Sequence, residues 1–224
     1  MPPDFKKLDS PSPWGDYGRI LVRGMTAHLP RKDGLLQLER TGPLVPAITF
    51  PGRSVVATDE GRRWFEENAP VVKFRPILKA KIVRLDWSTW DWAAPEPVDS
   101  PKGGEPENYI LSRRHSGKLA EQIGDCWECL VPEGGQLHAV LDASARFGYR
   151  YVLDRSSWSE APLFRANGTN QIFCTEQLSA LVSQTFGRWI EIRSAESYES
   201  IADLEIIPAD QLNSVMIEAL RRKS

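Results

Sequence analysis

The sequence lacks any long hydrophobic run, which limits where the protein is expected to work. No apolar stretch approaches the roughly 18 residues that a membrane-spanning helix needs, and no basic segment followed by an apolar run opens the chain. Only three of the 224 residues are cysteine, and an odd, small number does not make a disulfide framework. We therefore expect a cytoplasmic protein without a membrane anchor.

An excess of charge of one sign is also absent. The chain has 28 Lys and Arg against 30 Asp and Glu, a net charge of -2, and its pI is about 6.0. This balance gives no general attraction to nucleic acid or to a membrane surface, so neither is expected as a partner. What is present is ordinary for a folded domain: 41% hydrophobic and 26% charged residues.

The common catalytic motifs are missing, and the one C-x-x-C does not replace them. No G-x-S-x-G, H-E-x-x-H or P-loop pattern occurs. Cys126 and Cys129 lie in "GDCWECLV", but "LVPEGG" follows them instead of the helix that would lower a thiol pKa. Neither Cys174 nor any of the three histidines is paired at zinc-ligand spacing. We interpret the two cysteines as buried residues of a strand, and expect no catalytic residue, cofactor or metal.

Strand-like and helix-like patterns alternate irregularly, which predicts an α+β fold. Thr58 is suited to cap a helix that ends near Asn68, and Ser116 to cap a shorter one. The assignment of 137–148, where periods are mixed, is left open. Strands are expected at 18–25, 35–40, 71–77 and 78–87, and helices at 58–68, 116–124 and 209–222.

One internal similarity organises this pattern. Residues 54–75, "SVVATDEGRRWFEENAPVVKFR", parallel residues 171–193, "QIFCTEQLSALVSQTFGRWIEIR". Both read as strand, Ser/Thr-capped helix and strand, with Thr58-Asp59 matching Thr175-Glu176. The pattern indicates either an internal duplication or only a shared local shape.

The predicted organisation follows from this similarity. We expect a single mixed domain in which two similar strand–helix–strand units pack on a common core. Its parts are a loose N-terminal arm at 1–16 and one α+β domain at 17–224, with a first unit at about 41–85, a second at about 163–195 and a C-terminal helix at about 209–222.

A Trp-rich, acidic stretch is the most distinctive surface candidate. Three of the eight tryptophans fall in "WSTWDW", and from 86 to 107 there are six acids against one base, Lys102. Acidic loops beside Trp suit docking onto a basic protein surface; the alternative is a solvated loop over a Trp-containing core. The candidate interface residues are Trp87, Trp90, Asp91, Trp92, Glu96, Asp99, Glu105 and Glu107.

A competing interpretation is a small enzyme or ligand-binding protein. Arg113 and Arg114 flank His115, and His138 lies four residues before Asp142. Such groups can surround an anion or a small molecule in a pocket. The alternative is that these groups are solvated surface residues, which is the more common role of a basic turn before a helix cap.

Several short motifs resemble a bacterial family. They are a Phe-Arg lead at Phe164-Arg165, a hydrophobic strand at Ile172-Phe173, the helix start Thr175-Glu176, and the closing strand "VKFRP" at 72–76. Over roughly residues 41–195 the chain resembles the immunity proteins of bacterial polymorphic-toxin loci, a former domain of unknown function related to myxobacterial-type immunity proteins.

The resemblance implies a function in bacterial competition. It implies a cytoplasmic immunity protein that binds and occludes a cognate toxin encoded by a neighbouring gene and delivered by a system such as type VI secretion. A nuclease toxin would suit Glu96, Asp99, Glu105 and Glu107, which would stand in for phosphates. Some relatives carry paired C-x-x-C motifs followed by Gly that suggest zinc; here one pair is followed by Leu130, so the metal does not carry over. The family supplies no catalytic residues.

Overall fold

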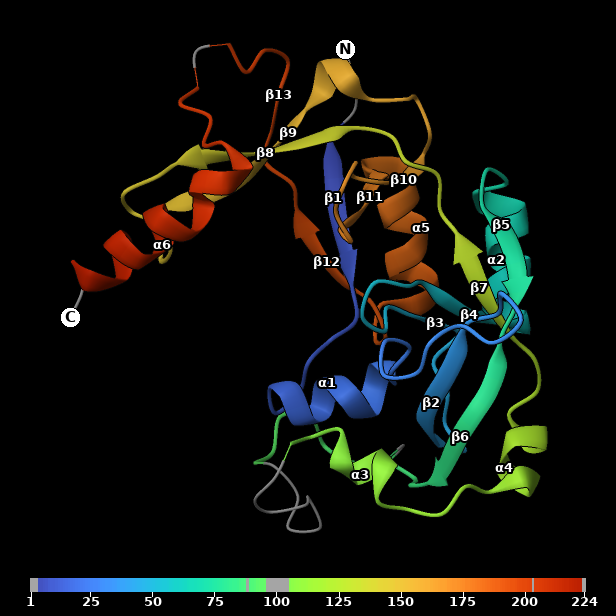
Figure 1. Ribbon diagram of the computed structural model, residues 1–224. Helices are drawn as coiled ribbons and strands as arrows, with labels where there is room; N and C mark the ends of the chain where they lie inside the picture. The colour runs from blue at the N-terminus through green and yellow to red at the C-terminus, as the bar shows by residue number, and fades with distance from the viewer. Residues whose placement is uncertain (1–3, 88, 96–104, 203, 223–224) are drawn as a thin grey trace. The chain divides into compact units, whose positions relative to one another are not determined.

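The chain forms two compact units, each assembled from separate stretches of sequence. The computed structural model describes residues 4–87, 89–95, 105–202 and 204–222 (Figure 1). One unit, here the β2–β6 unit, comprises residues 8–131 and 180–192. The other, the β8–β9 unit, comprises residues 1–7, 132–179 and 193–224.

The β2–β6 unit contains two sheets. A parallel pair joins β2 (Gln37–Gly42) to β6 (Leu78–Arg84), and α1 and α3 lie against this pair (Figure 1). A second sheet has the order β3-β4-β7-β5. Its strands are β3 (Ile48–Thr49), β4 (Val56–Thr58), β5 (Lys73–Pro76) and β7 (Cys126–Leu130), and the helices of the unit are α1 (Asp16–Arg23), α2 (Asp59–Asn68), α3 (Asn108–Leu111) and α4 (Gly117–Gln122).

The β8–β9 unit is built around an antiparallel hairpin. Strand β8 (Gln136–Leu141) pairs with β9 (Tyr149–Asp154), and β13 (Ser197–Tyr198) runs parallel to β9. Of the region 137–148 that the sequence left open, 137–141 is strand and 142–148 forms the turn of the hairpin. The unit also contains β10 (Leu163–Arg165), β11 (Ile172–Thr175), α6 (Leu212–Arg221) and the 3-10 turns η1 (Arg155–Ser157) and η2 (Ala209–Gln211). Three elements have residues in both units: β1 (Phe5–Asp9), α5 (Glu176–Phe186) and β12 (Glu191–Ser194).

The two strand–helix–strand segments have the same topology. In the first, the antiparallel strands β3 and β4 lead into α2 and β5, and β7 lies between β4 and β5. In the second, the antiparallel strands β10 and β11 lead into α5 and β12, and β1 lies between β11 and β12. The middle strand follows its segment in the first case and precedes it in the second. The shared local shape is confirmed, and duplication stays a hypothesis.

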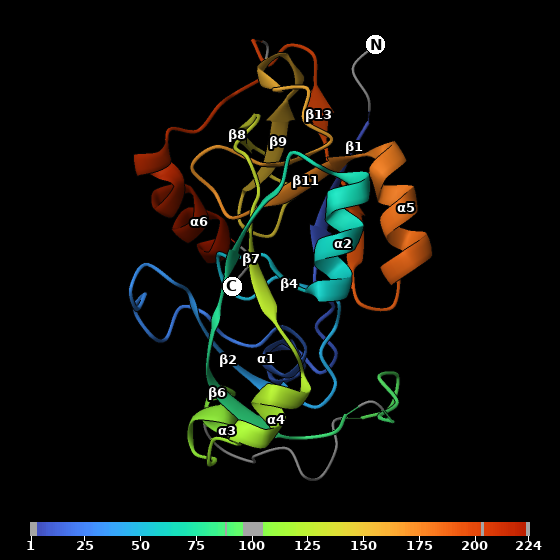
Figure 2. The same cartoon turned by 90° about the vertical axis from the view of Figure 1, so that its right-hand side faces the viewer.

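Helix α2 begins and ends where the sequence predicts. The Thr58 side chain accepts a hydrogen bond from the Gly61 amide at 3.5 Å, and Asp59 and Glu60 occupy the first turn. Residues 180–186 of α5 lie beside α2 (Figure 2), and the rings of Trp64 and Phe186 meet edge to face with centroids 5.3 Å apart. Within the β2–β6 unit the two helices therefore share a core.

Two sequence predictions at the N-terminal end are wrong. Residues 18–25 were expected to be a strand, but 16–23 form helix α1, because Tyr17 and Leu21 fall on one buried face at i, i+4 spacing. The expected loose arm at 1–16 contains strand β1, whose Phe5 is 1% exposed. Phe5 joins Leu153, Phe164 and Phe173 in a buried cluster. Burial of its apolar ring there favours an ordered strand, although the neighbouring prolines favour an irregular segment.

The predicted α+β class is confirmed. Helices and strands are both abundant and the strands form several sheets, none of them closed into a barrel. Among the described residues, none of the helices combines the length and apolar character that crossing a membrane requires. The extent of the single domain predicted at 17–224 stays a prediction.

Candidate functional site

The C-x-x-C pair is part of strand β7, as the sequence predicts. Cys126 packs with Leu36, Leu38, Val56 and Ile77 in a buried cluster. Burial raises the pKa of the Cys129 thiol strongly, and burial raises the pKa of Cys126 against the opposing effect of Arg40. Both thiols are therefore held protonated inside the sheet, which disfavours thiolate chemistry. Within the described ranges, no three His, Cys, Asp or Glu side chains gather in a way that could hold a metal ion.

Trp87, the first of the predicted interface tryptophans, is a core residue. Its side chain is 1% exposed, and its indole Nε1 donates to Thr41 Oγ1 at 3.1 Å. Its ring lies 5.8 Å from that of Trp189, edge to face. A partner cannot contact so buried a ring, so the prediction of Trp87 as an interface residue is wrong. Burial of a large aromatic ring against other rings is favourable through the hydrophobic effect.

Trp90 and Trp92 are half-buried, and each packs on a different cluster. Trp90 meets Trp14 edge to face at 5.8 Å beside Tyr17 and Tyr109. Trp92 meets Trp189 at 5.6 Å, and the Arg188 guanidinium lies 4.7 Å from the Trp189 ring. Their remaining exposed edges are available to a partner, but most of each ring is already used in packing.

The acidic candidates divide into those that lie at a cavity and those that do not. Glu105 and Glu107 line a cavity of about 530 Å³ in the β2–β6 unit. Asp91 is exposed elsewhere and its carboxylate accepts from the Ala93 amide at 2.9 Å in a tight turn. Glu96 and Asp99 lie outside the described residues.

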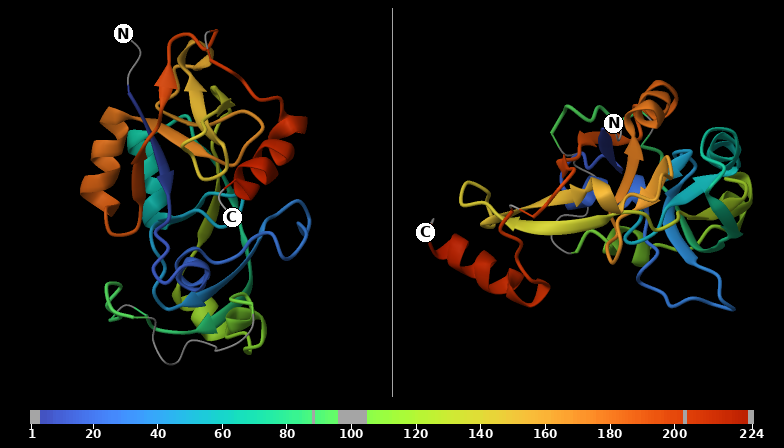
Figure 3. Two further views of the ribbon diagram at one scale, coloured as in Figure 1. Left: turned by 90° about the vertical axis from the view of Figure 1, so that its left-hand side faces the viewer. Right: turned by 90° about the horizontal axis from the view of Figure 1, so that it is seen from above.

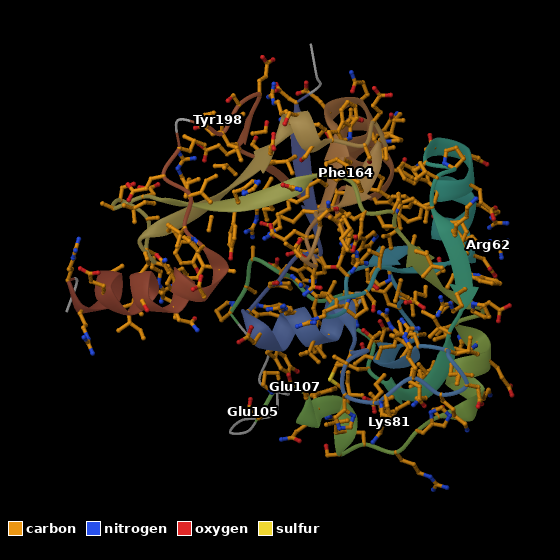
Figure 4. All side chains as sticks on the ribbon, turned by 45° about the horizontal axis from the view of Figure 1, so that its top comes forward. Arg62, Lys81, Glu105, Glu107, Phe164 and Tyr198 are labelled. Atoms are coloured by element: carbon orange, nitrogen blue, oxygen red, sulfur yellow. The ribbon has the colours of Figure 1, made fainter. Side chains whose placement is uncertain are left out.

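The cavity is lined by residues of the continuous stretch 16–28, by Gly52 and by residues 105–107. Helix α1 supplies one wall, the chain that follows it supplies a second, and residues 105–107 immediately before α3 supply a third. Figure 4 shows Glu105 and Glu107 close to one another beside α1. The lining residues are Asp16, Arg19, Ile20, Arg23, Gly24, Met25, Thr26, Ala27, His28, Gly52, Glu105, Pro106 and Glu107.

Most charged groups of the cavity already have a partner of opposite charge. Asp16 lies 3.9 Å from Arg19 one turn along α1. Arg23 lies 3.1 Å from Asp9 and also donates to the Ser10 carbonyl at 2.9 Å. The carboxylates of Glu105 and Glu107 differ from these groups, because they form no ion pair with any described residue.

His28 is held against a buried carboxylate. Its Nδ1 lies 2.8 Å from Glu39 Oε2, and the Glu39 side chain is only 5% exposed. The carboxylate accepts, so Nδ1 carries the proton and the ring orientation is fixed. This contact attaches the chain after α1 to strand β2 and thereby shapes one wall of the cavity.

Arg23 combines deep burial with an unused donor. It is 7% exposed and lines the cavity, and its Nε has no hydrogen-bond partner among the described residues. Burial lowers the pKa of Arg23, while the nearby Asp9 carboxylate raises it. A buried donor without an acceptor costs free energy, and the Nη2 group of the guanidinium is held by Asp9 and the Ser10 carbonyl.

The alternative His and Arg clusters do not line this cavity. His115 Nδ1 accepts from the Ile82 amide at 3.0 Å, so its role is structural. Arg113 lies over the Tyr109 ring at 3.4 Å. Asp142 pairs with Arg150 at 3.4 Å and accepts from Ser144. Those groups, with Arg114 and His138, are not among the residues that line the cavity beside α1.

The sequence reasoning missed the α1 half of the cavity. Asp16, Arg19 and Arg23 follow one another at i, i+3 and i+7, a helical spacing that would place them on one face. The run of Ile, Leu and Val between them suggested a strand instead. Compared with models of known protein families and with curated proteins, the chain matches none of either.

Proposed function

We propose that this chain is an immunity protein that binds a cognate antibacterial toxin in the cytoplasm and neutralises it by occlusion. The proposal rests on the resemblance of residues 41–195 to the immunity proteins of polymorphic-toxin loci. It also rests on a surface that suits a basic partner. A toxin encoded by a neighbouring gene, such as a nuclease delivered by a type VI system, is the proposed partner.

The observation that carries the proposal is the pair of free carboxylates at the cavity. Glu105 and Glu107 were both predicted as interface residues, and they line the same cavity without an ion pair to any described residue. A carboxylate without an internal ion pair attracts an approaching cation, because its negative charge is not neutralised within the protein. The exposed Asp91 and the half-buried Trp90 and Trp92 are proposed as further parts of the interface, outside the cavity.

The test is co-expression with the product of the neighbouring gene. We expect a tagged copy of this chain to retain that product through purification, and cells expressing it to survive the toxin. A protein that protects by occlusion does so at one-to-one stoichiometry without turnover. Survival conferred by far fewer copies than toxin molecules, or no retention at all, would contradict the proposal.

A further inference from the structure

We infer that two copies of this chain associate through the outer edge of strand β9. Tyr149 and Tyr151 of one copy pair, antiparallel, with Tyr151 and Tyr149 of the other. The occupant of the edge is therefore a second copy, and the two β8–β9 sheets join into one. This contact goes beyond the proposed function and does not rest on it.

The backbone of Tyr149 and Tyr151 faces away from β8. In an antiparallel ladder, pairs that exchange hydrogen bonds alternate with pairs whose amides and carbonyls point outward. Leu141 lies opposite Tyr149, and its amide donates to Glu205, outside the hairpin. The pair of Leu141 and Tyr149 is therefore of the outward type, and so is the pair that contains Tyr151, two residues along β9.

The neighbouring parts of the same sheet are covered by the chain itself. Along β8, residues 205–207 bond to the outward backbone groups. Along β9, the Leu153 amide donates to Glu196, and β13 pairs with the end of the strand (Figure 2). Among the residues that the structure describes, none bonds to the outward backbone groups of Tyr149 and Tyr151. An unpaired edge of this kind is a template for another strand.

This edge is complementary to itself. When Tyr149 lies opposite Tyr151 of the second copy, a two-fold axis passes between the two Arg150 residues. Each copy then offers the same amides and carbonyls to the other, and the pairing makes about four main-chain hydrogen bonds. Because both copies use the same surface, the assembly closes at two chains.

The tyrosine side chains suit this register. Tyr149 and Tyr151 project from the same face of the sheet, and their ring centroids lie 5.6 Å apart. Tyr151 is 43% exposed. In the pair, each tyrosine lies opposite a tyrosine of the other copy, and aromatic cross-strand pairs stabilise antiparallel strands.

The charges around Arg150 favour the approach of a second Arg150. Like charges directly opposite one another normally destabilise a strand pair. Here Asp142 lies 3.4 Å from Arg150, and Glu196 forms a second ion pair with it. One guanidinium is thus combined with two carboxylates, so the Arg150 of the second copy meets an excess of negative charge.

The first experiment follows the oligomeric state of the full chain. Sedimentation velocity is recorded from about 10 µM to about 1 mM, because a small interface gives a weak dimer. We expect a concentration-dependent equilibrium between monomer and dimer without larger species. A monomer throughout this range, or assembly that continues past the dimer, would overturn the inference.

The second experiment separates the backbone from the side chain at one position. Tyr151→Pro removes the outward amide and leaves the pairing with β8, which does not use that amide. Tyr151→Val keeps the amide and removes the ring. We expect the dimer dissociation constant of Tyr151→Pro to exceed that of Tyr151→Val at least about tenfold, with the β8 amide spectrum showing that the hairpin is folded. Equal constants would reject the pairing.

A disulfide tests the register even where Tyr151→Pro does not fold. In the proposed pair, the Cα atoms of residue 150 in the two copies lie about 4.5 Å apart, which a disulfide can bridge. R150C should therefore form a covalent dimer on mild oxidation at least about tenfold faster than I217C, which changes an exposed residue of α6. Equal rates would indicate random collision and contradict the inference.

Discussion

Arg31 donates two hydrogen bonds to Glu128, one from Nη1 to Oε2 at 2.9 Å and the other from Nη2 to Oε1. Glu128 belongs to β7 and is 6% exposed, while Arg31 lies in the chain between α1 and β2. The bond to Glu128 raises the pKa of Arg31. This ion pair fixes the segment between α1 and β2, which also contains His28, and so supports one wall of the cavity.

Arg31→Ala should destabilise the β2–β6 unit. The substitution leaves a buried carboxylate with only Arg75, whose Nε is 3.9 Å away. Because Arg31 is partly exposed, the expected loss in the free energy of unfolding is about 1–2 kcal/mol, below the value for a fully buried pair. Urea unfolding followed by fluorescence measures it.

Two variants control this prediction. Lys32→Ala removes the neighbouring exposed charge and should change stability little. Glu128→Gln in the Arg31→Ala background removes the uncompensated charge and should restore part of the loss. An Arg31→Ala variant as stable as Lys32→Ala would show that the pair does not hold the loop.

Trp87→Phe should lower stability and leave partner binding unchanged. The smaller ring leaves a cavity next to Trp189 and removes the bond to Thr41, which together should cost about 2 kcal/mol. Toxin affinity, measured at a temperature where the variant is folded, should equal that of the wild type. A selective loss of affinity at unchanged stability would restore Trp87 as an interface residue.

Cys174 should make the fold sensitive to alkali. Burial raises the pKa of its thiol from 9.0 to about 12, with nearby Lys6 opposing the shift. The folded state therefore holds a proton that the unfolded state releases, so this contribution is complete below pH 9 and is lost as pH rises toward 12. Between pH 8 and 10.5 the loss amounts to about 2 kcal/mol.

The Cys174→Ala variant isolates the contribution of this thiol to the pH dependence of stability. The variant is expected to be less stable than the wild type at pH 8 because it leaves a void, but to lose about 2 kcal/mol less between pH 8 and pH 10.5. Urea midpoints at the two pH values give the comparison. Parallel losses in the two proteins would mean that the thiol is not buried in solution.

Helix α6 should open locally before the rest of its unit. It contributes no buried residue, and it lies along the end of the β8–β9 hairpin (Figure 3). A Cβ on Gly148 would meet the Ala219 Cβ at 2.9 Å. Gly148→Ala should therefore detach α6 and speed its amide hydrogen exchange more than tenfold relative to β8 and β9.

Gly168→Ala is the matched control for that variant. Gly168 has φ +68°, close to the +78° of Gly148, but nothing lies within 4 Å of its Cβ position. Both variants carry similar backbone strain, and only Gly148→Ala adds a clash with α6. Equal exchange in α6 for the two variants would show that the helix is not seated on the hairpin.

The parts of the fold that depend on short-range chemistry could be read from the sequence. Thr58 and Ser116 cap α2 and α4 as expected, and the Ser116 hydroxyl accepts from the Leu119 amide at 3.3 Å. The strand around Cys126 follows from its own side chains and the turn after it. In each case the signal and the structure lie within a few residues of one another.

The parts that depend on distant partners could not be predicted. Strand β1 is ordered by contacts with residues near 153, 164 and 173, and the sequence around residues 5–9 gives no sign of these distant contacts. Glu105 and Glu107 were identified by charge, but the cavity exists only because α1 comes to lie beside them. Trp87 is a candidate interface residue by sequence but a core residue in the structure, because the sequence does not distinguish a buried ring from an exposed one.

The most direct test is calorimetric titration of the toxin with E105K/E107K at low and high ionic strength, with E199K/E205K as the control. We expect the E105K/E107K variant to lose binding by at least a hundredfold, roughly 1.4 kcal/mol or more for each site, and the control to keep both its affinity and its salt dependence. Wild-type affinity in E105K/E107K would contradict the claim that these two carboxylates receive the partner.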